Sequence, residues 1–445
     1  MLKRIWLFFV VTLLLSLSAC SDCAKPIIHL TAADSDFFYL SLRENITVDV
    51  FSPPVATRIY AYSFLSAHEC FALGGESPSL LPSLHGFKPF NTLIDSNKYI
   101  SYIASLEAFK LVATVGVYRG FIIQQTVDSQ MLRFVSKYNI DKKCVKYSIE
   151  KGAEVAHYVI ERMNADGYAA TRNKPFYNFS KSRSDWEPTA PTYGNAIEPY
   201  WPLLQTFIID SSNQFNMNMR MNFDSVRGSD FYNAASEVYR VFRADQKVDT
   251  DKLALAHFWD CNPVVNEIAG HATEIRKQNT PGGHWLGIAQ IHFRINNTNP
   301  VEALRDYTIL ACGMSDGFMV CWEQKYRYHL IRPETFINRY IDSKWRPILE
   351  CPLFPEFPSG HSVASAIAAD LLVHMFKKDE PYIDSTNRYI NMEPREFRSM
   401  KEAAKCAALS RFYGGIHYRY SIEQGLSLGD SVAAKVIERI KISPR

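Results

Sequence analysis

Three short segments in the C-terminal half of the chain place basic and histidine side chains where helix interiors are usually apolar. They are KYRYHLIRP (Lys325 to Pro333), FPSGH (Phe357 to His361) and SRFYGGIH (Ser410 to His417). Among their residues are the cations Lys325, Arg332 and Arg411, the hydroxyl of Ser359, the N–H of Gly360, and the imidazoles of His361 and His417. If the segments meet in one pocket, only a compact and highly charged oxyanion would justify gathering so much positive charge.

The first two segments bring their groups together by different local devices. Lys325 and Arg332 are seven residues apart, so on one helix both would project from the same face, two turns apart. Ser359 can cap a helix that begins near Gly360 and carries His361 on its first turn. The free N–H groups and the positive dipole end at such a start favour an anion. The sequence therefore predicts an anion site where this helix begins.

The third segment adds Arg411 and ends in His417 after two glycines, a turn that can present an imidazole into a pocket. Each feature alone is commonplace. A lysine and an arginine seven apart usually mark a solvated helix face, and a single histidine is usually structural. The evidence lies in the order and spacing of all three segments.

In that order and spacing, the segments resemble the signature of type 2 phosphatidic acid phosphatases and vanadium-dependent haloperoxidases. The signature is K-x6-RP, PSGH and SR-x5-H, and the chain fits it without a departure. Other stretches, such as FWDCNP and PGGHWLGIAQ, resemble the soluble bacterial, iodoperoxidase-like branch, so the resemblance covers nearly the whole mature chain. Trp322 and Phe354 fall where haloperoxidases place side chains that border the halide region.

The resemblance implies a vanadate cofactor, with vanadium bonded to Nε2 of His417. It implies that His361 acts as acid and base toward hydrogen peroxide and that Lys325 hydrogen-bonds the peroxide, which makes these three the expected catalytic residues. The groups implied to bind the vanadate oxygens are those of Lys325, Arg332, Ser359, Gly360 and Arg411. Vanadium would act as a Lewis acid while a halide attacks the polarised peroxide. Iodide is the expected halide, and bromide is possible.

The same residues also fit an acid phosphatase of this superfamily, because phosphate and vanadate share charge and geometry and can occupy one site. His417 would then attack a phosphomonoester to form a phosphohistidine, and His361 would protonate the leaving oxygen. A lipoprotein that only binds an oxyanion is a third interpretation, and it leaves both histidines without a role. The haloperoxidase is favoured because of the branch that the chain resembles.

Helical periodicity dominates the elements that must position these residues. Apolar residues recur at three and four positions over residues 53–75, 101–138 and 145–168, and again in the C-terminal half, whereas alternating strand patterns are scarce. This periodicity predicts an all-α fold, and the resemblance implies helical bundles of the haloperoxidase type. We expect a helical region over residues 31–230 and a catalytic helical bundle over residues 231–445.

Finer features suggest how these helices pack. Residues 166–202 are rich in Pro, Asn, Tyr and Trp and predict a long ordered loop held by its aromatic side chains. Gly425 and Gly429 lie four apart in the last helix and would let another helix approach closely. Asp316, on the same predicted helix as Lys325, is expected to orient one of the signature side chains.

The N-terminus indicates the cell envelope. Lys3 and Arg4 precede the apolar run IWLFFVVTLLLSL, and the segment ends in LSAC. Residues 1–19 therefore predict a lipoprotein signal peptide, with Cys20 lipidated and residues 20–30 as a tether. We expect an outer-membrane lipoprotein that faces the periplasm or the surface. Beyond this segment no apolar run approaches the ~20 residues of a membrane span, so the lipid is the only expected membrane contact.

Charge and cysteine content narrow the possible partners. A net charge of +3 on 445 residues is nearly balanced and the basic residues form no run, which argues against nucleic acid. The expected partners are instead hydrogen peroxide and halide, or a phosphomonoester. Of nine cysteines, eight remain after the one reserved for lipid. In an oxidising compartment some of these eight are expected to form disulfides, with a pairing that the sequence does not reveal.

Overall fold

A computed structural model describes residues 25–441 apart from 89, 91, 181, 220, 242–248 and 270–271, and for 264–276 it describes only the backbone. The predicted signal peptide, Cys20 and the first residues of the tether lie outside the described residues. Within the described part of the chain, every helix is too short or too polar to cross a lipid bilayer.

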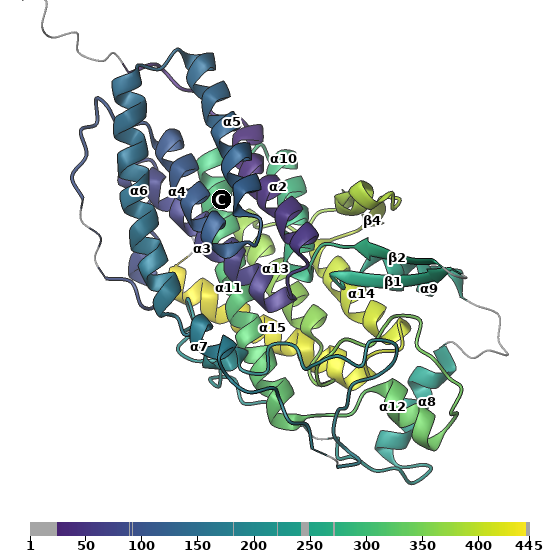
Figure 1. Cartoon of the computed structure of the whole chain (residues 1–445). Helices are drawn as coiled ribbons and strands as arrows, with labels where there is room; N and C mark the ends of the chain where they lie inside the picture. Colours follow the sequence, from purple (N-terminus) through teal and green to yellow (C-terminus); the bar gives the residue numbers. More distant parts are fainter. Residues whose placement is uncertain are drawn as a thin grey trace, which may run out of the picture.

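The N-terminal half is a group of long helices that pack side by side (Figure 1). Its elements are α2 (Ala32–Asp49), α3 (Pro53–Leu73), η1 (Leu81–Ser83), α4 (Ser101–Gly116), α5 (Gly120–Tyr138), α6 (Lys142–Ala165), α7 (Tyr168–Arg172) and η2 (Trp201–Leu203). The periodic stretch 101–138 is thus two helices. The helix is interrupted between α4 and α5 because the Asp49 carboxylate accepts hydrogen bonds from the backbone N–H groups of Tyr118 at 3.0 Å and Arg119 at 3.2 Å.

The C-terminal half adds further helices and two small hairpins. Its helices are α8 (Asp230–Val241), α9 (Thr250–Phe258), α10 (Pro281–Ile295), α11 (Pro300–Tyr328), α12 (Pro333–Tyr340), α13 (Gly360–Phe376), η3 (Thr386–Ile390), α14 (Met400–Tyr413) and α15 (Arg419–Ile440). The antiparallel strand pairs are β1 (Val264–Ala269) with β2 (Ala272–Lys277), and β3 (Tyr382–Asp384) with β4 (Arg395–Phe397). The predicted all-α architecture is confirmed, with the hairpins as small additions.

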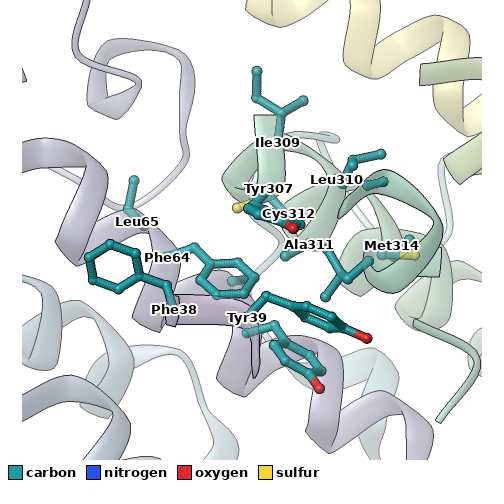
Figure 2. Packing of buried hydrophobic residues seen from close by; sticks show 14 of the residues in the cluster. Phe38, Tyr39, Phe64, Leu65, Tyr307, Ile309, Leu310, Ala311, Cys312 and Met314 are labelled. Carbon is teal, nitrogen blue, oxygen red and sulfur yellow. The ribbon is translucent and has the colours of Figure 1, made fainter. Parts of the chain in front are cut away.

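One hydrophobic core joins the two halves, and α11 runs through it against α3 and α13. Tyr307 of α11 stacks on Tyr39 of α2 with 5.9 Å between ring centroids, and Phe64 of α3 packs at 5.4 Å from Tyr307 (Figure 2). Helices from the first half therefore fix the position of α11. The division at residues 230 and 231 stays a prediction, although the core takes residues from both sides of it.

The start of α13 is held by α15. A Cβ atom on Gly425 would lie 2.9 Å from the carbonyl oxygen of Ser359, and one on Gly429 would lie 2.6 Å from that of Val363. Only glycine lets α15 come this close, as the spacing of the two glycines predicts. The backbone N–H of Ser359 also donates to the carbonyl of Ser421 at 3.2 Å. Backbone contacts with α15 therefore fix the segment at which α13 begins.

The range 166–202, predicted as a long loop, contains the short helix α7 and the start of η2, and its described residues are tied to the same region. The indole of Trp322 and the hydroxyl of Tyr326 both donate to the carbonyl of Ile197, at 3.1 Å and 2.7 Å. The N–H of Ile197 in turn donates to the carbonyl of Leu353 at 2.8 Å. The loop therefore forms a wall beside α11 and the segment that leads into α13.

Candidate active site

The PSGH segment begins a helix as predicted. Ser359 is the N-cap of α13, and its hydroxyl accepts a hydrogen bond from the N–H of Ser362 at 3.4 Å. Gly360 is the first helical residue, and His361 follows it on the first turn. Free N–H groups and the positive end of the helix dipole are thus present at this point, as an anion site requires.

Lys325 and Arg332 do not share a helix face, so that prediction is wrong. Helix α11 ends at Tyr328, His329 takes a left-handed conformation with φ 49°, and Arg332 is the N-cap of α12. The physical reason is Pro333, which disfavours a helical conformation at the residue before it. The two cations still converge, because both donate to carbonyl groups of the segment that leads into α13.

Lys325 is held by backbone carbonyls. Its ammonium donates to the carbonyl oxygens of Pro355 at 2.9 Å, Glu356 at 3.0 Å and Pro358 at 2.6 Å. Burial lowers the pKa of Lys325 to about 7, and the neighbouring charge of Arg332 acts in the same direction. Because three carbonyls already accept its N–H groups, direct contact of Lys325 with an oxyanion stays a prediction.

Arg332 links these carbonyls to the second histidine. Its Nη1 lies 2.8 Å from the carbonyl oxygen of Ile416 and 3.2 Å from Nε2 of His417, while its Nε and Nη2 donate to the carbonyl of Phe354 at 3.1 Å and 2.9 Å. A guanidinium carries no acceptor, so Nε2 of His417 must be the acceptor in this contact. The imidazole nitrogen expected to bond vanadium therefore carries a lone pair.

Glu356 fixes His417 from the other side and was not found from the sequence. Nδ1 of His417 lies 2.7 Å from Oε1 of Glu356, which also accepts from the N–H of Tyr418 at 3.0 Å, and Oε2 accepts from the hydroxyl of Ser421 at 2.6 Å. Burial, followed by the charge of Arg332, holds the pKa of His417 well below its usual range. The ring is thus neutral, with the proton on Nδ1.

A signal for Glu356 does exist in the sequence. It is a lone acidic residue in the proline-rich and otherwise apolar stretch CPLFPEFP, five residues before His361. A carboxylate in such a stretch must find a partner when it is buried. The sequence does not say that this partner is a histidine 61 residues away.

Arg411 is fixed by the segment after α9. Its Nη1 donates to the carbonyl of Trp259 at 2.9 Å, and its Nη2 lies 3.6 Å from a carboxylate oxygen of Asp260. Arg411 is buried, and its Nε has no hydrogen-bond partner among the described residues. A buried N–H without a partner costs free energy, so this donor is available for a ligand oxygen.

His361 has the same property. Its Nε2 is buried without a hydrogen-bond partner in the part of the chain that the structure describes. Burial, followed by the charge of Arg411, holds the pKa of His361 well below its usual range. His361 is therefore a neutral imidazole with one nitrogen free to take or give a proton.

A cavity of about 630 Å³ connects these groups. Its wall includes Gly360, His361, Arg411 and His417. Two unpartnered nitrogen atoms, a neutral histidine lone pair and buried guanidinium groups fit a compact tetrahedral oxyanion such as vanadate or phosphate. The structure thus brings Gly360 and His361 of the second segment and Arg411 and His417 of the third to the wall of one cavity.

Trp322 and Phe354 line the same cavity, with their ring centroids 4.9 Å apart. The Nζ of Lys325 lies 4.9 Å from the Phe354 centroid, and the guanidinium carbon of Arg332 lies 5.1 Å from it. These rings therefore form an apolar wall directly beside the cations. Their role in halide binding stays a prediction.

Asp316 does not orient a signature side chain, so that prediction is wrong. Its carboxylate accepts from the backbone N–H groups of Phe207 at 2.7 Å, Ile208 at 2.6 Å and Ile209 at 2.9 Å. Nine residues along a helix are about 13 Å, which is too far for contact with Lys325. Asp316 instead fixes the chain that follows η2.

Comparison with known proteins agrees with this geometry. Residues 340–443 match the family model of the VCPO second helical-bundle domain. Among solved structures, the chain is similar to one described as the first bacterial vanadium-dependent iodoperoxidase, with 34% identity, a TM-score of 0.85, and coverage of 94% of this chain and 98% of that chain. No curated protein sequence matches the chain.

Two more distant structures share the fold. The holo-type bacterial vanadium-dependent chloroperoxidase is 14% identical with a TM-score of 0.65, and it covers 95% of this chain and 99% of its own. The apo-type structure is 13% identical with a TM-score of 0.66, covering 88% and 95%. The iodoperoxidase structure shares 34% identity over 98% of its length, and on that basis the chain belongs to the family of vanadium-dependent haloperoxidases.

Proposed function

We propose that this haloperoxidase oxidises iodide with hydrogen peroxide and uses vanadate bound beside His417. The observation that carries the proposal is the state of His417. Glu356 accepts a hydrogen bond from the Nδ1–H at 2.7 Å, which leaves the Nε2 lone pair next to Arg332 in a cavity wall. A neutral imidazole of this kind is a good metal ligand, and its tautomer is set by the partner of the other nitrogen.

The remaining donors would hold the oxygens of the anion. Arg411 offers its unpartnered Nε, Gly360 its N–H at the start of α13, and Ser359 its hydroxyl. Arg332 and Lys325 would add positive charge next to the anion, in positions that are fixed by their hydrogen bonds to backbone carbonyl groups. Vanadate, when bound, supplies a Lewis acid that polarises hydrogen peroxide.

His361 would act as the acid and base toward the peroxide. Its neutral Nε2 can take a proton from an entering peroxide and return it to the departing hydroxide, which leaves as water. An anion bound beside Arg411 is expected to raise the pKa of His361, because it offsets the positive charge that lowers it. NMR titration of His361 with and without vanadate would measure this shift.

Iodide is the proposed halide for two reasons. It is the easiest halide to oxidise, and the structure with 34% identity is described as an iodoperoxidase. The aromatic wall of Trp322 and Phe354 also offers few hydrogen-bond donors, which favours the halide that is easiest to desolvate. Bromide is the alternative halide, and the same assay would detect its oxidation.

The test is reconstitution of the purified protein with orthovanadate, followed by measurement of peroxide-dependent iodide oxidation. We expect activity that requires vanadate and is blocked by excess phosphate, which competes for the same donors. Hydrolysis of p-nitrophenyl phosphate by the vanadium-free protein, without any halide oxidation, would instead identify a phosphatase and refute the proposal.

We propose further that Cys20 carries a lipid that anchors the enzyme in the outer membrane, facing the periplasm or surface. The support is the basic start, the apolar run and the LSAC sequence. Cell fractionation should place the full chain in the membrane fraction and the Cys20→Ala variant outside it, with Cys23→Ala as the control. Membrane association of Cys20→Ala would refute the anchor.

A further inference from the structure

A second cluster of reactive side chains lies outside the three signature segments. Sγ of Cys261 lies 3.5 Å from Nδ1 of His284, and Nε2 of His284 lies 2.9 Å from Oδ2 of Asp384. A thiol, an imidazole and a carboxylate in this order form the arrangement that activates a cysteine nucleophile. The three residues come from separate parts of the chain, since Cys261 follows α9, His284 belongs to α10 and Asp384 belongs to β3.

The geometry of the cluster is fixed on every side. His284 and Asp384 are fully buried. Oδ1 of Asp384 accepts from the N–H of Thr386 at 2.9 Å and from its hydroxyl at 2.6 Å. The Trp259 ring stacks on the imidazole of His284 at 4.5 Å with an interplanar angle of 20°. The imidazole therefore cannot turn away from the sulfur without breaking these contacts.

The electrostatics favour a proton on the imidazole. Burial alone would lower the pKa of His284, but the charges of Asp384 and Cys261 outweigh it and raise this pKa to about 10. An imidazole within hydrogen-bond reach of a thiol, itself oriented by a carboxylate, is the arrangement that activates a cysteine as a nucleophile. Arg411 adds a second positive charge near Cys261.

Cys261 is also placed where an oxidant arrives. It lines the same cavity of about 630 Å³ as His361, Arg411 and His417. Hydrogen peroxide is smaller than any organic substrate, so a peroxide molecule that reaches these residues can also reach the sulfur. The proposed function is needed only to explain why peroxide enters the cavity.

We propose that Cys261 is an activated thiol which hydrogen peroxide in the cavity oxidises to a sulfenic acid. The thiolate attacks one peroxide oxygen, an S–O bond forms, and the O–O bond breaks. The leaving hydroxide takes the proton from Nδ1 of His284 and departs as water. Sulfur is oxidised and the peroxide is reduced, and a thiol can later reverse the modification.

Cys351 provides a control within the same molecule. It lines the same cavity and carries a free thiol, so peroxide has access to both sulfurs. Its neighbour is the Glu334 carboxyl rather than an imidazole, and burial together with that charge raises the pKa of Cys351 well above its usual value. Any difference in reactivity between the two sulfurs therefore reports their chemical surroundings and not the size of the oxidant.

The experiment treats the full-length protein with hydrogen peroxide in the presence of dimedone, which traps sulfenic acids, and locates the label by peptide mass spectrometry. We expect label on Cys261 at least ~10-fold above label on Cys351, since only the first of these two sulfurs has an imidazole beside it. Equal labelling of the two cysteines, or label on Cys351 alone, would overturn the proposal.

Two variants test the activating groups. Asp384→Asn and His284→Gln should each reduce the label on Cys261 several-fold without changing that on Cys351, and Cys261→Ser should remove it. Thermal unfolding shows whether each variant is folded. If a variant does not fold, the comparison of Cys261 with Cys351 in the unaltered protein still decides the question.

The outcome is separable from that of the proposed function. Dimedone labelling needs neither vanadate nor halide, so the vanadium-free protein should give the same pattern. Labelling of Cys261 without iodide oxidation would support the activated thiol and refute the haloperoxidase proposal. Iodide oxidation with an unlabelled Cys261 would do the reverse.

Discussion

The hydrophobic core around Tyr307 and the polar site around Lys325 lie on the same helix, α11, and both residues are fully buried. In the core, rings from α2 and α3 surround Tyr307, and burial of apolar surface stabilises the fold (Figure 2). In the site, burial of charge is unfavourable, and backbone carbonyls and Glu356 offset it. Equal burial therefore serves stability at one end of the helix and reactivity at the other.

The first way to test this contrast is to remove the histidine of the site. His417→Ala should lower vanadate-dependent iodide oxidation by roughly 10³-fold or more, because the group that would bond vanadium is lost. Its melting temperature should stay close to that of the unaltered protein. The exposed His157 offers a control in His157→Ala, which should change neither quantity. Substantial activity in His417→Ala would remove this histidine from the mechanism.

The core should respond in the opposite way. Phe64→Ala should lower the free energy of unfolding by ~3–5 kcal/mol, because it leaves a cavity beside Tyr307. Chemical denaturation measures this loss, and vanadate affinity of the folded protein should be unchanged. Phe121→Ala is the matched control, since Phe121 is 58% exposed and should change stability little. Loss of vanadate affinity without loss of stability in Phe64→Ala would contradict the contrast.

Glu356 sharpens the comparison because it acts on the site through another residue. Glu356→Gln keeps the size of the side chain but weakens its hold on the Nδ1 proton of His417, so vanadate affinity should fall by ~10–100-fold. Vanadate titration measures this change, and nitrogen NMR of His417 reports its tautomer. Glu350→Gln is the control, because Glu350 lines the same cavity but binds Thr192. An unchanged tautomer and affinity in Glu356→Gln would exclude a positioning role.

The smallest effect concerns pH. The pKa of Lys325 is lowered from 10.5 to about 7, mainly by burial. Between these values the unfolded chain binds the proton and the folded chain does not, so this lysine makes the free energy of unfolding rise with pH by about 1.4 kcal/mol per unit. Below the window both states are protonated. Lys325→Met should remove this rise.

Urea denaturation at several pH values between neutrality and the usual lysine pKa measures the slope. Glu356 has the opposite sign and a different window, because its pKa is raised from 4.5 to about 7 by burial, so its contribution to stability falls as pH rises through that range. An identical slope in Lys325→Met and in the unaltered protein above neutrality would show that Lys325 keeps its proton in the folded state.

Local sequence predicts some features of the site correctly and others wrongly. The cap at Ser359, the first-turn His361 and the close approach at Gly425 follow from local chemistry, and all three are confirmed. The expectation of one helix through Lys325 and Arg332 failed, because Pro333 disfavours a helical conformation at Arg332, which becomes the N-cap of a new helix. The expectation for Asp316 failed because nine residues along a helix separate it from Lys325 by about 13 Å, and its carboxylate binds the N–H groups that follow η2 instead.

The sequence by itself determined which chemical groups the enzyme possesses, because signature residues and helix starts depend on local spacing. It could not determine their partners. These partners are 23 to 100 positions apart: Glu356 beside His417, the carbonyls around Lys325, and the contacts from Cys261 to His284 and from His284 to Asp384. Only the packed structure decides such contacts, because burial removes water and makes each polar group depend on whichever group the fold brings beside it.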